Sequence, residues 1–257
     1  MFVDSHCHID FPELSENIEA LLDNMRDAGV THALCVSVNL ADWPRVLGLA
    51  ESHGNLYASV GVHPDQPVDE MEPSEEDLLG RADHPRIVAI GETGLDYYRL
   101  TGDLSWQRDR FRTHIRAALT CGKPLIIHTR AAAEDTVAIM REENAGNAGG
   151  VMHCFTETWD VARAALDLGF YISFSGIITF KNAADLREVV RQVPMERMLI
   201  ETDSPYLAPV PYRGKTNQPA YVKHVAECVS QIKNIPLEIV AKTTTENFFK
   251  LFSDAKV

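Results

Sequence analysis

The stretch Met1-Phe2-Val3-Asp4-Ser5-His6-Cys7-His8 is a short apolar run that ends in two histidines two positions apart. On an extended strand, His6 and His8 point to one face and Cys7 points to the other. Two imidazoles on one face can hold a metal ion. With 10 histidines in 257 residues such a pair can also arise by chance. The pair therefore gains meaning only if other strands end in the same way.

Short apolar or β-branched runs recur along the chain, with helical patterns between them. Ile18, Leu21, Leu22 and Met25 repeat with helical spacing, and similar patterns occupy 111–119, 161–168 and 222–232. The expected strands are 2–5, 33–38, 56–60, 87–90, 125–127, 150–152, 170–174 and 198–200. Eight strand and helix units in this length predict an α/β fold, a (β/α)8 TIM barrel that forms a single domain over residues 1–257. A doubly wound open sheet is the alternative, but no glycine-rich dinucleotide motif follows an early strand.

The composition is that of an ordinary globular protein, with 45% hydrophobic, 24% charged and 8% aromatic residues. The net charge of 24 − 37 = −13 argues against a partner held mainly through phosphates, although a local basic loop could still contact one. Five scattered cysteines without a CxxC pair indicate a reducing compartment. No charged leader and no long apolar stretch is present, so we predict a cytoplasmic protein that binds no membrane. We infer no obligate protein partner.

Polar side chains follow nearly every expected strand. In a barrel, the carboxyl ends of the strands meet at one mouth, where active sites of this fold are built. The candidate metal ligands are His6, His8, Glu92, His128, His153 and Asp203. The alternative is that His128 and His153 are hydrogen-bonded core residues. Such a nitrogen and oxygen set suits Zn²⁺ or Mn²⁺ better than Mg²⁺.

Six ligands are more than one tetrahedral ion needs, so two divalent cations per chain are the more plausible arrangement. Glu92 is the natural bridge between them. It lies on the fourth strand, between the strand-one pair and the later histidines, and a carboxylate has two oxygens to share.

Seven ordered motifs extend this pattern over nearly the whole chain. They are 3–8 (VDSHCH), 61–64 (GVHP), 91–97 (GETGLDY), 128–130 (HTR), 153–156 (HCFT), 201–209 (ETDSPYLAP) and 213–217 (RGKTN). With these motifs the chain resembles the TatD family of metal-dependent deoxyribonucleases, within the amidohydrolase-like barrels. The resemblance implies a two-metal site made of the same six ligands and hydrolysis of DNA phosphodiesters from a 3′ end. One departure is Ala131, where the family usually has an acidic residue; Glu134 is the nearby candidate to replace it.

In this scheme a hydroxide activated by two metals attacks the phosphorus, with Glu92 and Asp203 as the catalytic carboxylates. Asp203 either accepts the proton of the attacking water or is a plain ligand. Glu201 shares a strand face with Asp203, so we expect it to orient a histidine. His63 is expected near the substrate, with a turn histidine as the alternative.

Phosphate binding falls to three cations near the expected mouth: Arg130, Arg213 and Lys215. Their alternative role is ordinary surface charge. Tyr97 and Tyr98 could stack on bases, whereas Phe155 is better suited to the core. Strand alternation should point Cys7 and Cys154 away from the site.

Three functions follow from these observations. The first is a metal-dependent DNA 3′ exonuclease. The second is a hydrolase of a small ester, lactone or amide, which the acidic charge would suit better. The third is a metal-binding scaffold without catalysis.

Overall fold

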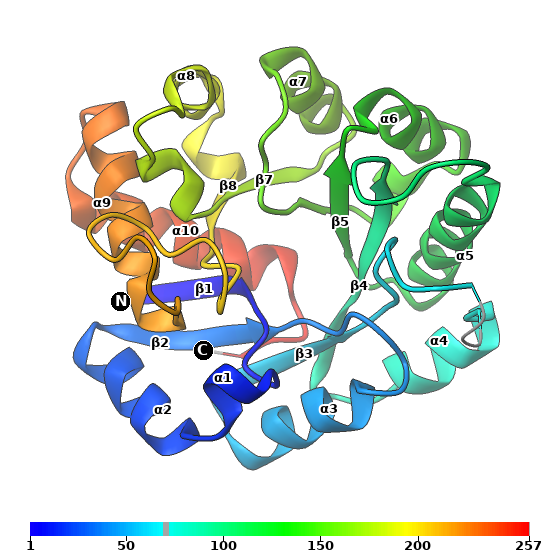
Figure 1. Cartoon of the computed structure of the whole chain (residues 1–257), viewed down its shortest axis with the longest axis horizontal. Helices are drawn as coiled ribbons and strands as arrows, with labels where there is room; N and C mark the ends of the chain where they lie inside the picture. Colours follow the sequence, from blue (N-terminus) through cyan, green and yellow to red (C-terminus); the bar gives the residue numbers. More distant parts are fainter. Residues whose placement is uncertain (69–71, 257) are drawn as a thin grey trace.

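A computed structural model of the chain describes residues 1–68 and 72–256. In it, eight parallel strands form one sheet in which spatial order follows sequence order (Figure 1). The strands are β1 (Phe2–Cys7), β2 (Val30–Cys35), β3 (Leu56–Val60), β4 (Ile87–Asp96), β5 (Leu125–Arg130), β6 (Gly150–Met152), β7 (Tyr171–Phe174) and β8 (Met198–Ile200).

The last strand returns to the first just beyond its end. Cys7 and Ser204 form a parallel bridge, and the backbone N–H of His8 donates to the Ser204 carbonyl over 2.8 Å. The N–H of Asp203 donates to the His6 carbonyl over 3.0 Å. The sheet therefore closes into the predicted single-domain barrel, and the open-sheet alternative is excluded.

Helices cover the outside of the barrel (Figure 1). They are α1 (Pro12–Ser15), α2 (Ile18–Asp27), α3 (Trp43–Ser52), α4 (Glu75–Ala82), α5 (Ser105–Cys121), α6 (Ala133–Glu142), α7 (Trp159–Asp167), α8 (Ala184–Gln192), α9 (Val222–Lys233) and α10 (Leu237–Leu251). Short 3-10 turns lie at η1 (Ala145–Asn147), η2 (Gly176–Thr179), η3 (Met195–Arg197) and η4 (Pro219–Tyr221). The four helices expected from periodicity correspond to α2, α5, α7 and α9. No helix in the described part of the chain has both the length and the apolar character to cross a membrane.

The barrel interior is an apolar cluster with at least one side chain from every strand, from Val3 on β1 to Leu199 on β8. Phe248 and Phe252 of α10 belong to the same cluster. In Figure 1 this helix, in red, lies behind the strands. The amino-terminal end of the barrel is therefore plugged, and polar side chains can gather only at the opposite mouth.

Five strands differ from their expected bounds, and β2 and β4 differ most. β2 begins at Val30 and ends at Cys35 rather than covering 33–38, because Val30 and His32 pair with β1 although Thr31 and His32 interrupt the apolar pattern. β4 runs on from Ile90 to Asp96, and its polar half pairs with β5. Hydrogen bonds to a neighbouring strand keep this polar stretch extended, and the extension brings Asp96 to the mouth.

Candidate metal centre

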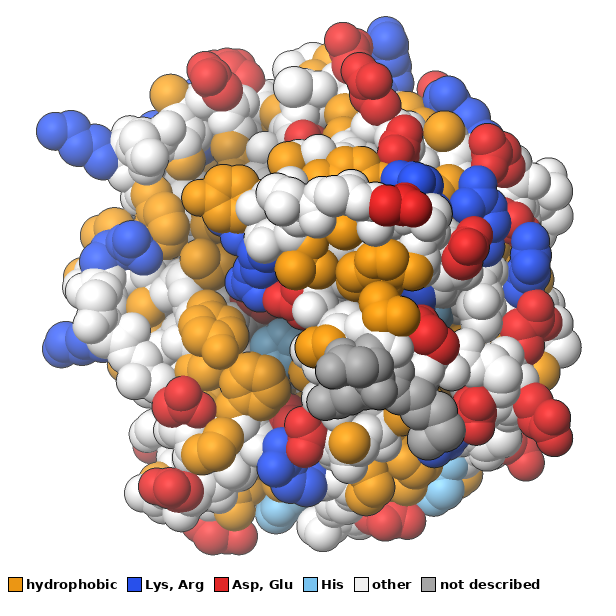
Figure 2. Space-filling model, turned by 45° about the vertical axis from the view of Figure 1, so that its right-hand side comes forward, with side chains coloured by type: hydrophobic (Ala, Val, Ile, Leu, Met, Phe, Trp, Pro, Cys, Tyr) orange, Lys and Arg blue, Asp and Glu red, His pale blue; other side chains and the backbone are white. Residues whose placement is uncertain are grey.

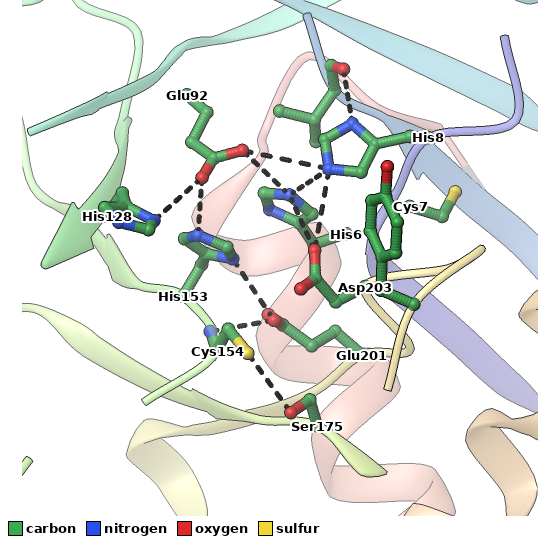
Figure 3. A network of polar contacts seen from close by, with 12 residues as sticks. His6, Cys7, His8, Glu92, His128, His153, Cys154, Ser175, Glu201 and Asp203 are labelled. Atoms are coloured by element: carbon green, nitrogen blue, oxygen red, sulfur yellow. Dashed lines mark hydrogen bonds and ion pairs between the residues drawn. The ribbon is translucent and has the colours of Figure 1, made fainter. Parts of the chain in front are cut away.

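The six predicted ligands converge at the mouth of the barrel, with the Glu92 carboxylate among them (Figure 3). Glu92 Oε2 lies 3.3 Å from His6 Nε2 and 3.8 Å from His8 Nε2. Asp203 Oδ1 lies 3.7 and 3.5 Å from the same two nitrogens, which are 3.3 Å apart. Ligands about 2.1 Å from a tetrahedral ion are about 3.4 Å from one another. These four atoms therefore have the spacing of a metal-binding set, which we call the Oε2 group.

The other oxygen of Glu92 faces a different set of histidines. Glu92 Oε1 lies 2.8 Å from His153 Nε2, 3.1 Å from His128 Nδ1 and 3.2 Å from His63 Nε2. We call these three histidines with Glu92 Oε1 the Oε1 group. Sequence reasoning placed His63 near the substrate; the structure brings it into direct contact with the ligand cluster.

Close backbone packing positions Glu92. A Cβ atom on Gly61 would lie 2.4 Å from the Gly91 carbonyl carbon, and one on Gly91 would lie 2.6 Å from the Ile126 carbonyl oxygen. Only glycine allows β3, β4 and β5 to approach this closely. The Glu92 N–H then donates to the Ser37 carbonyl over 3.0 Å. A side chain at either glycine would displace the Glu92 carboxylate.

The two groups hold their histidines in different ways. In the Oε1 group each second ring nitrogen contacts a carboxylate: His63 contacts Asp65, His128 contacts Asp96 over 3.1 Å, and His153 contacts Glu201 over 3.2 Å. In the Oε2 group, His8 Nδ1 contacts a backbone carbonyl, that of Val36, over 3.1 Å. His6 Nδ1 has no hydrogen-bond partner among the described residues.

Carboxylates behind metal-binding histidines fix the ring orientation and raise ligand basicity. Glu201 makes the contact that its predicted orienting role requires. Glu201 lies directly after β8, and its Oε1 also accepts the Cys154 N–H over 2.7 Å, so it is fixed to the residue after His153 as well.

The charges of the cluster balance through protonated histidines. Burial alone would raise the pKa of Glu92, but His153 and His63 hold it well below its usual value. Burial alone would lower the pKa of both histidines; carboxylates raise that of His153 well above its usual value and that of His63 to about 9. In the metal-free protein, protons on His63 and His153 therefore balance the buried negative charge of Glu92, which a bound cation would balance instead.

Unpaired buried atoms also fit a cation. Among the described residues, His6 Nδ1 and Glu201 Oε2 are buried without a hydrogen bond, and His153 Nε2 has the ion-pair contact with Glu92 Oε1 at 2.8 Å but no hydrogen bond. Buried polar atoms without hydrogen bonds are costly, and a cation beside Glu92 would give His153 Nε2 a partner. Subsets of the cluster have the spacing of metal sites, including His6 with His8 and Asp203, and His63 with Glu92 and His128. The residues present thus fit divalent cations.

The cluster lies at one wall of a cavity of about 640 Å³. Arg130 lines this cavity, and its guanidinium carbon lies 3.8 Å from the centre of the Tyr98 ring. Phe11 and Tyr206 line it as well, and Tyr206 is 55% exposed. Figure 2 shows histidine side chains recessed in a hollow, beside hydrophobic, basic and acidic side chains.

Arg213 and Lys215 are not among the residues that line this cavity. The Arg213 guanidinium lies 3.6 Å from the Phe180 ring centre, and the Lys215 ammonium lies 5.8 Å from that of Tyr212. Their contact with phosphate stays a prediction. Glu134, the candidate to replace the acid missing at Ala131, does not line the cavity either.

Cys7 points away from the site, as predicted, and its thiol donates to the Leu34 carbonyl. The thiol of Cys154 also points away from the ligand cluster, with Sγ 3.2 Å from Ser175 Oγ, although the residue is among those that line the cavity (Figure 3). β6 ends at Met152, so contacts beyond the strand set the direction of Cys154, whose φ is 42°. Phe155 is buried and packs against Phe174, as expected.

Three charged residues of the site were missed: Asp65, Asp96 and Arg99. Asp65 and Arg99 line the cavity, and Asp96 bonds to His128. Asp96 could have been found, because it lies four residues after Glu92 and so shares its strand face. Asp65 and Arg99 lie in loops, where spacing predicts no direction.

Comparison with known proteins agrees with both the fold and the sequence motifs. A family model described as TatD related DNase matches residues 3–253. The chain belongs to the TatD family. It is 46% identical over 254 residues to the metal-dependent hydrolase YcfH of Escherichia coli K12, covering 97% of this chain and 95% of that one. It is 40% identical over 255 residues to the metal-dependent hydrolase YabD of Bacillus subtilis, covering 98% and 99%.

A solved TatD homologue supports the architecture. The crystal structure of YJJV from Escherichia coli K12 matches with a TM-score of 0.91 and 29% identity, covering 98% of both chains. The predicted TatD resemblance and the TIM barrel are both confirmed.

Proposed function

We propose that this TatD-family chain is a divalent-metal-dependent hydrolase that cleaves DNA phosphodiesters from the 3′ end. The observation that carries the proposal is the placement of Glu92, which presents one oxygen to the Oε2 group and the other to the Oε1 group. A carboxylate between two sets of nitrogen and oxygen donors suits a pair of cations. The names of the relatives support a metal-dependent hydrolase, and the description of the family model is what suggests DNA as its substrate.

Two cations would be held by His6, His8 and Asp203 on one side of Glu92 and by His128 and His153 on the other. The donor set suits Zn²⁺ or Mn²⁺, and Mg²⁺ less well. When bound, such ions lower the pKa of a water molecule and neutralise charge on phosphoryl oxygens.

Asp203 is the carboxylate best placed to take a proton during the reaction. Its side chain is 16% exposed and lines the cavity, whereas Glu92 is 3% exposed. Burial would raise the pKa of Asp203, but His8, His6 and His153 hold it well below its usual value. It is therefore ionised at neutral pH and can accept a proton from the attacking water.

The cavity dimensions favour the end of a strand as substrate. A volume of about 640 Å³ is typical of a small-ligand site, which admits a terminal nucleotide more readily than the middle of a duplex. Phe11 and Tyr206 at its wall offer faces on which a base can stack. Arg130 offers a guanidinium to a phosphate.

A small ester, lactone or amide is the second candidate substrate. The net charge of −13 favours it, because an acidic protein repels a polyanion at long range. The same metal centre could hydrolyse such a bond.

The test is to incubate metal-reconstituted protein with a 3′-overhang oligonucleotide and to resolve the products by length over time. We expect a ladder shortened from the 3′ end, abolished by chelation and by Asp203→Asn, and unchanged in the surface control Asp160→Asn. Turnover of neutral esters without any cutting of DNA would favour the second candidate. If Asp203→Asn leaves the biological phenotype intact, the scaffold hypothesis would replace both.

A further inference from the structure

The Oε1 group belongs to a closed ring of polar contacts. From Glu92 Oε1 the ring passes through His63 to Asp65 and from Asp65 to the Arg99 guanidinium. It returns from the Arg99 backbone N–H to Asp96, and through His128 to Glu92. Every step is a contact between neighbouring members. A displacement of any one of them is therefore felt on both sides of the ring.

Arg99 is the most exposed member of this ring. Its side chain is 54% exposed and lines the cavity, whereas the side chains of Asp96 and Glu92 are 0% and 3% exposed. The backbone N–H of Arg99 donates to Asp96 Oδ1 over 2.9 Å, which fixes the turn after β4. Only its Nη1 atom makes a side-chain hydrogen bond among the described residues, to Asp65. The other guanidinium donors remain available to a ligand.

The position of Arg99 also complements that of Arg130. Arg99 follows β4, Arg130 is the last residue of the neighbouring strand β5, and Asp96 pairs with Arg130 in the sheet. Among the residues that line the cavity, Arg99 and Arg130 are the arginines, and no lysine lines it. A chain with a net charge of −13 thus places two guanidiniums beside its metal centre.

We propose that Arg99 forms a phosphate subsite: its guanidinium binds the phosphodiester next to the one being cleaved, and Asp65 positions it. This inference rests on the proposed function and specifies its substrate as a polyanion with at least two adjacent phosphates. Guanidiniums bind phosphate oxygens in pairs, and Asp65 leaves one edge of the group free to do so. A neutral ester would gain nothing from this subsite.

The main test compares Arg99→Met and Arg99→Lys with the control Arg163→Met, an arginine 61% exposed on α7. A charge-assisted hydrogen bond contributes about 1.5–3 kcal/mol, so we expect Arg99→Met to raise KM for an oligonucleotide about 10- to 100-fold. We expect kcat to change by less than about threefold, because the contact is formed in the ground state as well as the transition state. Arg99→Lys should recover part of the loss, and Arg163→Met should behave as wild type.

A substrate change isolates the contact. An oligonucleotide with an uncharged methylphosphonate at the linkage next to the scissile one should have a higher KM with wild type than the unmodified oligonucleotide. With this modified substrate, Arg99→Met should have the same KM as wild type. Asp65→Asn should raise KM in the same direction. An Arg99→Met variant that cuts DNA with unchanged KM, or a methylphosphonate that adds its full penalty to the variant, would overturn the subsite.

Failure of the proposed function gives a different result. In that case wild type cuts no DNA. Fluorescence anisotropy then measures the binding of a labelled oligonucleotide to chelator-treated protein, and this binding tests the subsite. About tenfold weaker binding by Arg99→Met than by Arg163→Met supports it, and equal binding overturns it.

Discussion

The Oε2 group and the Oε1 group share one carboxylate but are built differently. The Oε2 group combines the adjacent pair His6 and His8 with Asp203, and its histidines are backed by a carbonyl or by nothing. In the Oε1 group, His63, His128 and His153 are each backed by a carboxylate. The first resembles a preformed cation site, and the second is a basic site whose cation must displace protons. The two sides should therefore differ in affinity and in response to pH.

Removing the shared carboxylate should have the largest effect, because it removes a ligand from both groups. For Glu92→Gln we expect activity to fall at least about 10³-fold and bound metal to fall from two ions per chain to one or none. Elemental analysis after dialysis and the rate of DNA cleavage check this. The control is Glu134→Gln, the same chemical change at an exposed position on α6. Two tightly bound ions in Glu92→Gln would show that the groups do not depend on it.

The free energy of unfolding should depend on pH through His114, a histidine that is hydrogen-bonded to the loop that carries His63. This buried histidine accepts the Val62 N–H over 3.0 Å, and burial lowers its pKa to about 4. Its contribution to stability is present above pH 6.5 and is lost as pH falls through 4, since the unfolded state binds the proton more readily. The difference from 6.5 corresponds to about 3 kcal/mol.

Denaturant unfolding of metal-free protein between pH 7 and 4 measures this contribution. We expect wild type to lose about 3 kcal/mol more than His114→Gln over that interval, while the partly exposed control His53→Gln follows wild type. Parallel curves for wild type and His114→Gln would contradict the assignment.

Removing one supporting carboxylate should separate the two groups. Asp96→Asn keeps the size of the side chain but removes the charge behind His128. We expect about 10- to 100-fold weaker binding of one cation and unchanged binding of the other. Competition titrations with a metal indicator check this, with Asp135→Asn, an exposed carboxylate that bonds to Tyr97, as control. Equal weakening of both cations would remove the distinction between the groups.

The pH dependence of metal binding should be a smaller effect than those of the substitutions, but it tests the difference between the two groups directly. Below pH 9, His63 carries a proton in the metal-free protein, and carboxylates also raise the pKa of His153. A cation bound by His153 must displace the proton of that ring, so the apparent affinity of this group should rise up to about tenfold per pH unit below the raised pKa of His153. The Oε2 group should respond over a narrower pH range. Burial followed by the charge of His153 lowers the pKa of His6, and the pKa of His8, which Asp203 raises against the effect of burial, is raised less than that of His153.

Calorimetric titrations at several pH values, each in two buffers of different ionisation enthalpy, count the released protons. We expect the cation that binds to the Oε1 group to release one or more protons at pH 7. Affinity that falls as pH rises would contradict the assignment of protonated histidines to this group.

Much of the fold was predictable because each strand carries its own apolar signal. The bounds of β3, β6 and β8 match the expected ones, and the ligands at strand ends followed from the barrel. β4 was cut short because its second half is polar and stays extended only through pairing with β5. That error hid Asp96.

The parts of the site that could not be predicted depend on loops. The directions of Asp65 and Arg99 are set by contacts with each other and with the buried ring, which no local pattern encodes. Arg213 and Lys215 follow the strand that precedes Asp203. Their side chains, however, lie over the rings of Phe180 and Tyr212, and neither residue lines the cavity. Side-chain positions were predictable on the strands and directly after their ends, as for His8, His153 and Asp203, but not farther into the loops.

The most direct test of the central claim is to grow crystals with Mn²⁺ or Zn²⁺ and to locate the ions by anomalous scattering. The account predicts two peaks about 3.5–4 Å apart. One should lie against His6, His8 and Asp203, the other against His128 and His153, with one Glu92 oxygen on each. A single peak, or a pair that Glu92 does not bridge, would contradict it.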